Sequence, residues 1–194
     1  MKHLYLMRHG QTLFNVRRKI QGWCDSPLTE LGIEQAKAAR ECLQDITFDH
    51  YYSSTAERCC DTLEIVTHHE KPYKRLKGLK ERYFGTFEGE SEDLNPPIQK
   101  YDEFFPPFGG ETKEQVQKRM LETLTEIMEK DDHETVLAVS HAGACRCFLS
   151  HLGNPEELLC GEKLTNACIL HFCYDKHQFQ FIEILKPTVK GETL

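Results

Sequence analysis

Short apolar runs alternate with amphipathic segments along the chain, and this pattern predicts strands that alternate with helices. Strands are expected at residues 4–7, 48–53, 73–79 and 135–140, followed by a hairpin of residues 167–174 and 178–185. Helices with one apolar face are expected at residues 30–43, about 56–68, 113–130 and about 142–152. Strands and helices that alternate in this way form a largely parallel sheet covered on both faces. The predicted fold class is α/β, a three-layer α/β/α sandwich around a mixed, mostly parallel sheet.

Hydroxyl side chains mark the starts of several of these helices, because their oxygens accept a hydrogen bond from the first turn. Thr29 and Thr112 are expected to cap the helices that follow them. Either Ser54 or Thr55 is expected to cap the second helix. We expect one domain, residues 1–194, with a frayed tail after Pro187.

The periodicity fails between Gly85 and Gly110, where prolines, acids and aromatic side chains take its place. We interpret residues 85–110 as an excursion over the candidate site that contains one short helix. Loops of this length in a compact domain usually carry function or move. Its aromatic side chains, together with Tyr83 and Phe84, either line a pocket for an apolar leaving group or form a small core of their own. The sequence leaves both alternatives open.

Composition is ordinary for a globular protein: of 194 residues, 39% are hydrophobic and 28% are charged, which suits one domain with a sizeable core. No apolar run approaches the roughly 20 residues that a membrane-spanning helix needs. The N-terminal apolar run is also too short for a signal peptide. We therefore expect a cytoplasmic protein with no membrane association, in which the nine cysteines are reduced and mostly buried.

The net charge is −7. Nucleic acid is therefore a poor candidate partner, because no basic stripe is available to neutralise its phosphates. An anionic substrate would have to be bound by a local group of cations and not by the field of the whole molecule.

Two of the predicted strands end in similar polar residues. Strand 4–7 runs into Arg8-His9-Gly10, and strand 135–140 runs into His141 at the start of a helix. If the two strands are parallel neighbours, both imidazoles meet at one sheet edge, where α/β folds bind ligands. Arg58 lies near the start of a helix that follows a strand, and Glu81 follows the third strand. We expect all these side chains to converge.

Such a set of side chains fits phosphoryl transfer through a covalent intermediate. A neutral imidazole can attack phosphorus and carry the phosphoryl group. Guanidinium groups can bind the phosphoryl oxygens with charge-assisted hydrogen bonds, and a protonated carboxyl group can supply a proton to the departing alkoxide. The positive charge comes from the protein, so the chemistry requires no metal and no cofactor.

Other ways of handling phosphate lack their signatures. The chain has no Gly-x-x-x-x-Gly-Lys-Ser/Thr loop. No cysteine is followed six positions later by arginine, and no aspartate is followed two positions later by aspartate. A His-x-x-x-His zinc motif with glutamate is also absent.

The sequence resembles the histidine phosphatase superfamily, the group with phosphoglycerate-mutase-like folds, over about residues 4–150. The resemblance rests on five ordered motifs. These are the stretch from Leu4 to Gly32 with Arg8-His9-Gly10-Gln11-Thr12, Asn15, Gln21-Gly22 and Asp25 to Thr29; Tyr52-Ser53-Ser54 with Arg58 and Thr62; Glu81 to Gly85 with Glu88-Gly89; Gly109 to Thr112; and Val139 to Gly143.

The resemblance implies a role for each matching residue. His9 would be the phosphorylated nucleophile and Glu81 the proton donor. The phosphoryl group would be held by Arg8, Arg58 and His141, with help from Asn15. Gln21 and Gly22 would shape the substrate pocket. Arg82 and Lys80 are expected to be solvated.

Within this family we favour the phosphatase branch, a metal-independent phosphoric monoester hydrolase of the histidine acid phosphatase type. A mutase must exclude water and hold a substrate carboxylate plus a second phosphate, which demands extra cations. The excursion has Lys100 as its only cation, and the first motif reads Gly10-Gln11-Thr12 where mutases tend to have Gly-Glu-Ser. A cofactor-dependent phosphoglycerate mutase is the alternative. A phosphate-dependent binding protein without turnover is less favoured, because it would need neither His9 nor Glu81.

The expected partner is a small phosphorylated metabolite, with no nucleic acid and no membrane. The protein is expected to be a monomer or a homodimer. The sequence does not identify the substrate.

Overall fold

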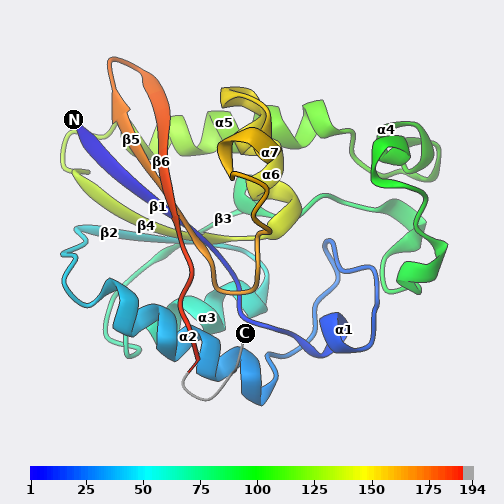
Figure 1. Cartoon of the computed structure of the whole chain (residues 1–194), viewed down its shortest axis with the longest axis horizontal. Helices are drawn as coiled ribbons and strands as arrows, with labels where there is room; N and C mark the ends of the chain where they lie inside the picture. Colours follow the sequence, from blue (N-terminus) through cyan, green and yellow to red (C-terminus); the bar gives the residue numbers. More distant parts are fainter. Residues whose placement is uncertain (190–194) are drawn as a thin grey trace.

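The structure, a computed structural model, describes residues 1–189. Within them, a six-stranded mixed sheet has the order β3-β2-β4-β1-β5-β6 (Figure 1). The strands are β1 (Lys2–Arg8), β2 (His50–Ser54), β3 (Lys74–Leu76), β4 (Thr135–Ser140), β5 (Ile169–Asp175) and β6 (Gln178–Leu185). Strands β3, β2, β4 and β1 are parallel, whereas β5 is antiparallel to both β1 and β6. The predicted fold class is confirmed.

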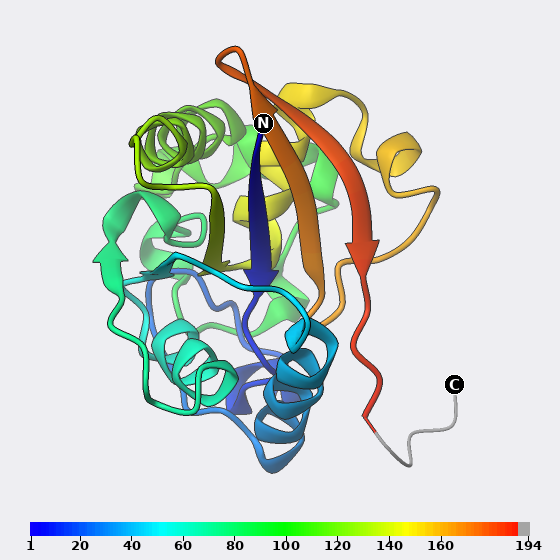
Figure 2. The ribbon, with the colours of Figure 1, turned by 90° about the vertical axis from the view of Figure 1, so that its left-hand side faces the viewer.

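Helices cover both faces of this sheet, as Figure 2 shows. The helices are α1 (Leu13–Val16), α2 (Glu30–Leu43), α3 (Glu57–Val66), α4 (Tyr101–Phe104), α5 (Lys113–Met128), α6 (Ala142–Leu152) and α7 (Pro155–Leu158). Side chains alternate across a strand, so Leu4 and Leu6 of β1 pack on the α5–α6 side, while Tyr5 and Met7 pack on the α2–α3 side. Two apolar cores result, one on each face.

Local details differ from the sequence predictions. Helix α3 begins after Ala56, which has no side-chain hydrogen bond to the first turn, so neither Ser54 nor Thr55 is its N-cap. Ser54 is used elsewhere: its hydroxyl faces His141 and also accepts the Ala56 N–H. Strand β3 covers only Lys74–Leu76, and the chain then turns into a 3₁₀ segment, Lys77–Leu79. The short helices α1 and α7 were not predicted.

The excursion is built from short turns around an aromatic cluster. It contains α4 and four 3₁₀ turns, Gly85–Phe87, Glu92–Leu94, Ile98–Lys100 and Pro106–Phe108. Phe105 is fully buried at the centre and contacts four other rings, those of Phe84, Phe87, Tyr101 and Phe104. The chain closes at Gly85, which has a φ of +62°, and a Cβ there would lie 2.0 Å from the Phe108 carbonyl oxygen. The excursion therefore has a small core of its own.

The register of the sheet determines where the polar residues meet. Arg8 at the end of β1 is paired with Ser140 at the end of parallel β4. His9 and His141 therefore leave two adjacent strands at the same level, as the sequence predicted.

Two further predictions can be compared with the structure. All nine cysteines are free, and six of them are buried. The tail after Pro187 has no regular structure at residues 187–189, and its remainder lies outside the described residues. In residues 1–189 no helix is both long enough and apolar enough to span a membrane.

Candidate active site

His9 is buried just beyond the end of β1, and its two ring nitrogens have different partners. Nδ1 lies 2.7 Å from the Gly10 carbonyl oxygen, which accepts a hydrogen bond and therefore requires a proton on Nδ1. Nε2 accepts a hydrogen bond from Arg58 Nε at 3.3 Å. Burial, followed by the charges of Arg58 and Arg8, lowers the pKa of His9 well below its usual value. His9 is thus a neutral imidazole with the lone pair on Nε2.

The turn after His9 depends on close backbone contacts. The Gly10 N–H donates to Thr62 Oγ1 at 3.1 Å. A Cβ on Gly10 would lie 2.4 Å from the carbonyl oxygen of Gly32, so the approach of these two backbone segments excludes any larger residue. The position of His9 is therefore fixed by contacts with α2 and α3.

Arg58 is fully buried near the start of α3, and each of its five N–H groups has an acceptor. The acceptors are His9 Nε2, His141 Nδ1, Asp25 Oδ1 and the carbonyl oxygens of Gly22 and Cys24. The distances run from 2.8 Å to Gly22 to 3.3 Å to His9. One guanidinium thus joins both imidazoles to the loop of residues 22–25.

His141 caps α6 and is also completely buried. Its Nδ1 accepts a hydrogen bond from Arg58 at 2.9 Å, because a guanidinium only donates. Its Nε2 then carries the proton and donates to Ser54 Oγ at 2.8 Å. Burial, followed by the charge of Arg58, lowers the pKa of His141 well below its usual value. The ring lies at an angle of 68° to that of His9, with 5.3 Å between centroids.

Glu81 is buried and held by two backbone donors. The N–H of Arg82 donates to Oε1 at 2.8 Å, and that of Gly143 donates to Oε2 at 2.9 Å. Gly143 lies in the first turn of α6, where unpaired N–H groups favour a carboxylate. A Cβ at position 143 would lie 2.6 Å from Oε1, so glycine is required for Glu81 to keep this position.

Arg8, Asn15 and Gln21 line the same cavity as His9. Arg8 donates to the Leu164 carbonyl oxygen at 2.6 Å, and its buried Nε has no hydrogen-bond partner in the described part of the chain. Asn15 forms a capping box with Thr12 at the start of α1. Gln21 is oriented by two contacts, since it accepts from Thr12 Oγ1 at 2.7 Å and donates to a serine hydroxyl at 3.0 Å.

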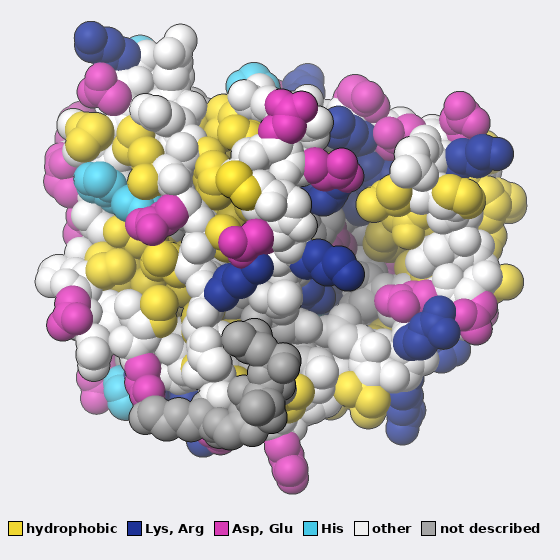
Figure 3. Space-filling model, viewed as in Figure 1, with side chains coloured by type: hydrophobic (Ala, Val, Ile, Leu, Met, Phe, Trp, Pro, Cys, Tyr) yellow, Lys and Arg dark blue, Asp and Glu magenta, His cyan; other side chains and the backbone are white. Residues whose placement is uncertain are grey.

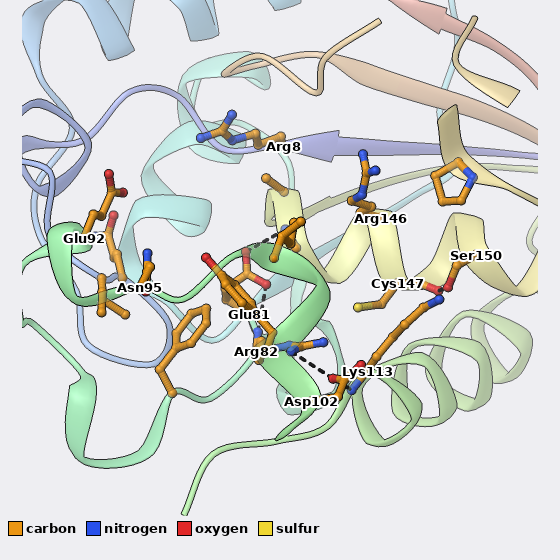
Figure 4. Close-up of a pocket in the computed structure, with 18 of the residues that line it drawn as sticks. Arg8, Glu81, Arg82, Glu92, Asn95, Asp102, Lys113, Arg146, Cys147 and Ser150 are labelled. Carbon is orange, nitrogen blue, oxygen red and sulfur yellow. Dashed lines mark hydrogen bonds and ion pairs between the residues drawn. The ribbon is translucent and has the colours of Figure 1, made fainter. Parts of the chain in front are cut away.

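These residues adjoin a cavity of about 530 Å³ (Figure 4). Of the predicted site residues, Arg8, His9, Asn15, Gln21 and Glu81 line it. The cavity is not lined by Gly22, Arg58 or His141. Arg58 and His141 are buried and contact the His9 ring. The opposite wall comes from the excursion, including Tyr101 and Asp102. Figure 3 shows the resulting hollow, with lysine and arginine side chains along its margin.

Several residues of the cavity wall were not predicted from the sequence. Arg82 was expected to be solvated, but it is buried, lines the cavity and forms an ion pair with Asp102 at 3.1 Å. Lys113 and Arg146 line the same wall from α5 and α6 (Figure 4). Lys80, also expected to be solvated, lies 3.9 Å above the Trp23 ring. Only the fold brings Arg82, Lys113 and Arg146 to one cavity, and no sequence spacing relates them.

Two further residues, Glu88 and Asn166, form hydrogen bonds to the backbone around the site. Glu88 accepts four backbone N–H groups, those of Gly22, Trp23, Cys24 and Phe84, at 2.8–3.2 Å. Asn166 Nδ2 donates to the His9 carbonyl oxygen at 3.2 Å and to Asn15 Oδ1 at 3.3 Å. Glu88 belongs to one of the sequence motifs, whereas Asn166 lies in a segment without any pattern.

The aromatic residues serve both purposes considered from the sequence, since some line the cavity and most form a small core. Phe84 and Tyr101 line the cavity, while Phe87, Phe104, Phe105 and Phe108 pack against one another. Tyr83 packs on Trp23, with 4.8 Å between the ring centroids. The aromatic residues are mainly the core of the excursion.

Residues 4–185 match the family model of the histidine phosphatase superfamily (branch 1). The chain belongs to the histidine phosphatase superfamily. Among relatives, it is 30% identical over 171 residues to the uncharacterized phosphatase PhoE of Bacillus subtilis, covering 87% of this chain and 86% of PhoE. It is 32% identical to the probable phosphoglycerate mutase GpmB of Proteus mirabilis, covering 90% and 86%. Named relatives of this superfamily member thus include both phosphatases and mutases.

Solved structures of the superfamily are similar throughout. YhfR of Bacillus stearothermophilus has a TM-score of 0.83 at 29% identity and covers 100% of this chain and 98% of its own. The phosphoserine phosphatase of Entamoeba histolytica, solved with 3-phosphoglyceric acid, has a TM-score of 0.79 at 28% identity and covers 95% and 96%. The fold is therefore phosphoglycerate-mutase-like, as the resemblance implied.

Proposed function

We propose that the chain is a phosphatase that hydrolyses a small phosphomonoester through a phosphohistidine at His9, with no metal ion in the reaction. One observation carries this proposal: the Gly10 carbonyl requires the proton of His9 to be on Nδ1, so the lone pair is on Nε2 of a side chain that lines the cavity and contacts Arg58. A neutral, oriented imidazole is a nucleophile, whereas an imidazolium is not.

In the first half-reaction, His9 Nε2 attacks phosphorus, the P–N bond forms, and the ester P–O bond breaks. Two N–H groups of Arg58 are directed at His9 Nε2 and His141 Nδ1. Phosphoryl oxygens can take over these donors only when substrate displaces the contacts with the two rings, because Arg58 is buried and does not line the cavity. The unpartnered Nε of Arg8 is a further donor. These fixed cations stabilise the charge of the transition state.

Glu81 handles the protons of both half-reactions. In its protonated form it gives a proton to the departing alkoxide, and as a carboxylate it then accepts a proton from the water that attacks the phosphohistidine. The P–N bond breaks, phosphate leaves, and His9 and protonated Glu81 are regenerated. The Arg82 and Gly143 N–H groups orient both oxygens and favour the carboxylate, which is the form that acts as the base in the second half-reaction. In the first half-reaction the proton has to occupy a remaining lone pair of one of these oxygens.

The cavity wall favours a polar, charged leaving group over the apolar one considered above. It carries two ion pairs, Arg82–Asp102 and Arg146–Glu156, so charges of both signs face the leaving group. A molecule with both an amino and a carboxylate group can pair with such a wall. The relative from Entamoeba histolytica is named a phosphoserine phosphatase, and O-phosphoserine is therefore the first metabolite to test.

The test uses p-nitrophenyl phosphate in the presence of a chelator. We expect His9→Ala to abolish hydrolysis, and a single-turnover reaction of the wild type, quenched in base, to yield phosphohistidine. We expect Glu81→Gln to slow O-phosphoserine hydrolysis far more than that of p-nitrophenyl phosphate, whose leaving group needs no proton. Activity retained in His9→Ala would assign another nucleophile.

Phosphoglycerate mutase remains a second candidate because of the cavity wall. The excursion is poor in cations, but Arg82, Lys113 and Arg146 bring positive charge to the cavity from other elements. The argument from the excursion's composition is thereby weakened. Fast isomerisation of 3-phosphoglycerate with a trace of the bisphosphate, without release of phosphate, would favour the mutase.

A further inference from the structure

Two histidines and an aspartate meet at the end of the sheet opposite the candidate active site. His50 is the first residue of β2, and Asp132 and His133 lie just before β4. Strands β2 and β4 are parallel, with His50 paired to Val136, so the three residues gather at the amino ends of the strands. They take no part in the reaction proposed above.

Asp132 bridges the two imidazoles. Its Oδ1 lies 2.7 Å from His133 Nδ1, and its Oδ2 lies 3.1 Å from His50 Nε2. The ligand atoms of the three residues all lie within 4.8 Å of one another. The rings are nearly parallel, with centroids 3.6 Å apart. Two nitrogens and one carboxylate thus lie within reach of one ion, but parallel rings do not direct both nitrogen lone pairs at the same point.

Neighbouring side chains hold this cluster in place. Tyr52 Oη lies 2.7 Å from His133 Nε2, so this nitrogen can donate its proton to the phenol oxygen while Nδ1 binds another partner. Lys130 Nζ fixes the same phenol oxygen at 2.9 Å. Asp49 Oδ2 accepts the two backbone N–H groups that follow His133, each at 2.8 Å. Histidine ligands of metals usually have such a partner on the second nitrogen.

The cluster is open to solvent on one side. The His133 side chain is only 4% exposed, whereas that of His50 is 34% and that of Asp132 is 71% exposed. An ion can therefore enter from solvent, and water can complete its coordination. His50 and Asp132 also have room to adjust their positions.

We propose that His50 Nε2, the Asp132 carboxylate and His133 Nδ1 bind a divalent transition-metal ion, for which Zn²⁺ is the best match. Two imidazoles and one carboxylate suit Zn²⁺, with water as the fourth ligand. Neighbouring ligands of tetrahedral zinc lie roughly 3.3 Å apart, given its bond lengths. Binding therefore requires the Asp132–His133 contact to widen slightly and the exposed His50 ring to turn, so that both nitrogen lone pairs point at the ion. The ion replaces the proton on His133 Nδ1 and also the proton on His50 Nε2, which lies 3.1 Å from both the carboxylate and the carbonyl oxygen of Asp132. The ion would join the starts of β2 and β4, away from the phosphoryl chemistry.

The experiment titrates the chelator-treated full chain with Zn²⁺ against a chromophoric zinc indicator. We expect one equivalent to bind and to raise the melting temperature. His50→Ala and Asp132→Asn should each weaken binding roughly 10-fold or more, and Tyr52→Phe, which removes only the phenol oxygen, about 10-fold. His177→Ala is the matched control, because His177 contacts Glu129 at 2.8 Å outside the cluster. This control should leave the affinity unchanged.

The same experiment distinguishes zinc binding at this cluster from binding at His9 or at the cysteine thiolates. His9→Ala should still bind one equivalent, and Co²⁺ should give d–d absorption without thiolate charge-transfer bands. The proposal is overturned by the absence of saturable binding, by binding that survives in His50→Ala, or by an equivalent lost in His9→Ala instead. Because these readouts do not involve turnover, they are independent of the proposed phosphatase activity.

Discussion

Replacing Glu88 by glutamine tests whether a carboxylate remote from phosphorus positions Arg58. The two oxygens of Glu88 accept four backbone N–H groups, three of them from residues 22–24. The carbonyl oxygens of Gly22 and Cys24 in turn accept hydrogen bonds from the Arg58 guanidinium at 2.8 and 2.9 Å. In the glutamine variant one oxygen becomes an NH₂ group, and two of the four N–H donors then face another donor.

The magnitude follows from these bonds. Each hydrogen bond to a charged group contributes about 1.5–3 kcal/mol, so loss of two destabilises the fold by roughly 3–6 kcal/mol. The loop of residues 22–24 shifts, and Arg58 moves with it. A displacement of about 1 Å in such a group lowers kcat on the order of 100-fold. Because Glu88 acts through Arg58, we expect the loss mainly in kcat, together with a similar loss of vanadate affinity.

The assay compares Glu88→Gln with Glu90→Gln at a temperature where both proteins are folded. Glu90 is exposed and lies two residues further along the same segment, so it controls for the loss of one charge. Vanadate inhibition separates displacement of Arg58 from simple destabilisation, which changes only the folded fraction. If kcat and vanadate inhibition were the same in both variants, Glu88 would have no positioning role.

Three further outcomes are expected. Gly143→Ala should lower kcat on the order of 100-fold, because the added Cβ would displace Glu81. Gly153→Ala is the control and should have little effect, since its Cβ would have no neighbour nearer than 3.5 Å. Equal kcat values in the two variants would contradict this reasoning. The lowered pKa of His9 means that, below about pH 6.5, the imidazole takes up a proton in the unfolded chain but stays neutral in the folded protein. The urea-measured free energy of unfolding should therefore fall between pH 6 and 5 by about 1 kcal/mol more in the wild type than in His9→Asn; parallel pH curves would refute a neutral buried His9. Phe105→Ala should destabilise the protein by about 3–5 kcal/mol, and half-exposed Phe108→Ala by much less; similar melting temperatures would argue against a packed aromatic core.

Much of the site could be predicted because it lies at strand ends. His9 and His141 follow apolar runs directly, and parallel pairing places such residues side by side. What could not be predicted depends on side-chain geometry. Ser54 was expected as a cap candidate, but its hydroxyl is used by His141, and α3 begins after Ala56 instead. Local propensity carries no information about such a competing partner.

Residues that meet only through the tertiary fold escaped prediction for the same reason. Arg82 follows Glu81 in a motif and has the charge of a surface residue, yet it is buried because Asp102, twenty positions later, returns to pair with it. His50 and His133 are joined only by the register of β2 and β4. Neither pair has a spacing that a linear pattern could reveal.

The aromatic core of the excursion has an evolutionary consequence. Because Phe105 and its neighbours pack mainly on one another, residues 85–110 behave as a unit whose surface can diverge while the sheet and the nucleophile stay unchanged. Exchange of this excursion therefore offers a route to new substrates, provided that Glu88 and its four backbone hydrogen bonds are kept. A chimaera that carries the corresponding excursion of another superfamily member, with Glu88 retained, should change the preference for those leaving groups that contact Tyr101 and Asp102, and it should keep the recipient's chemistry.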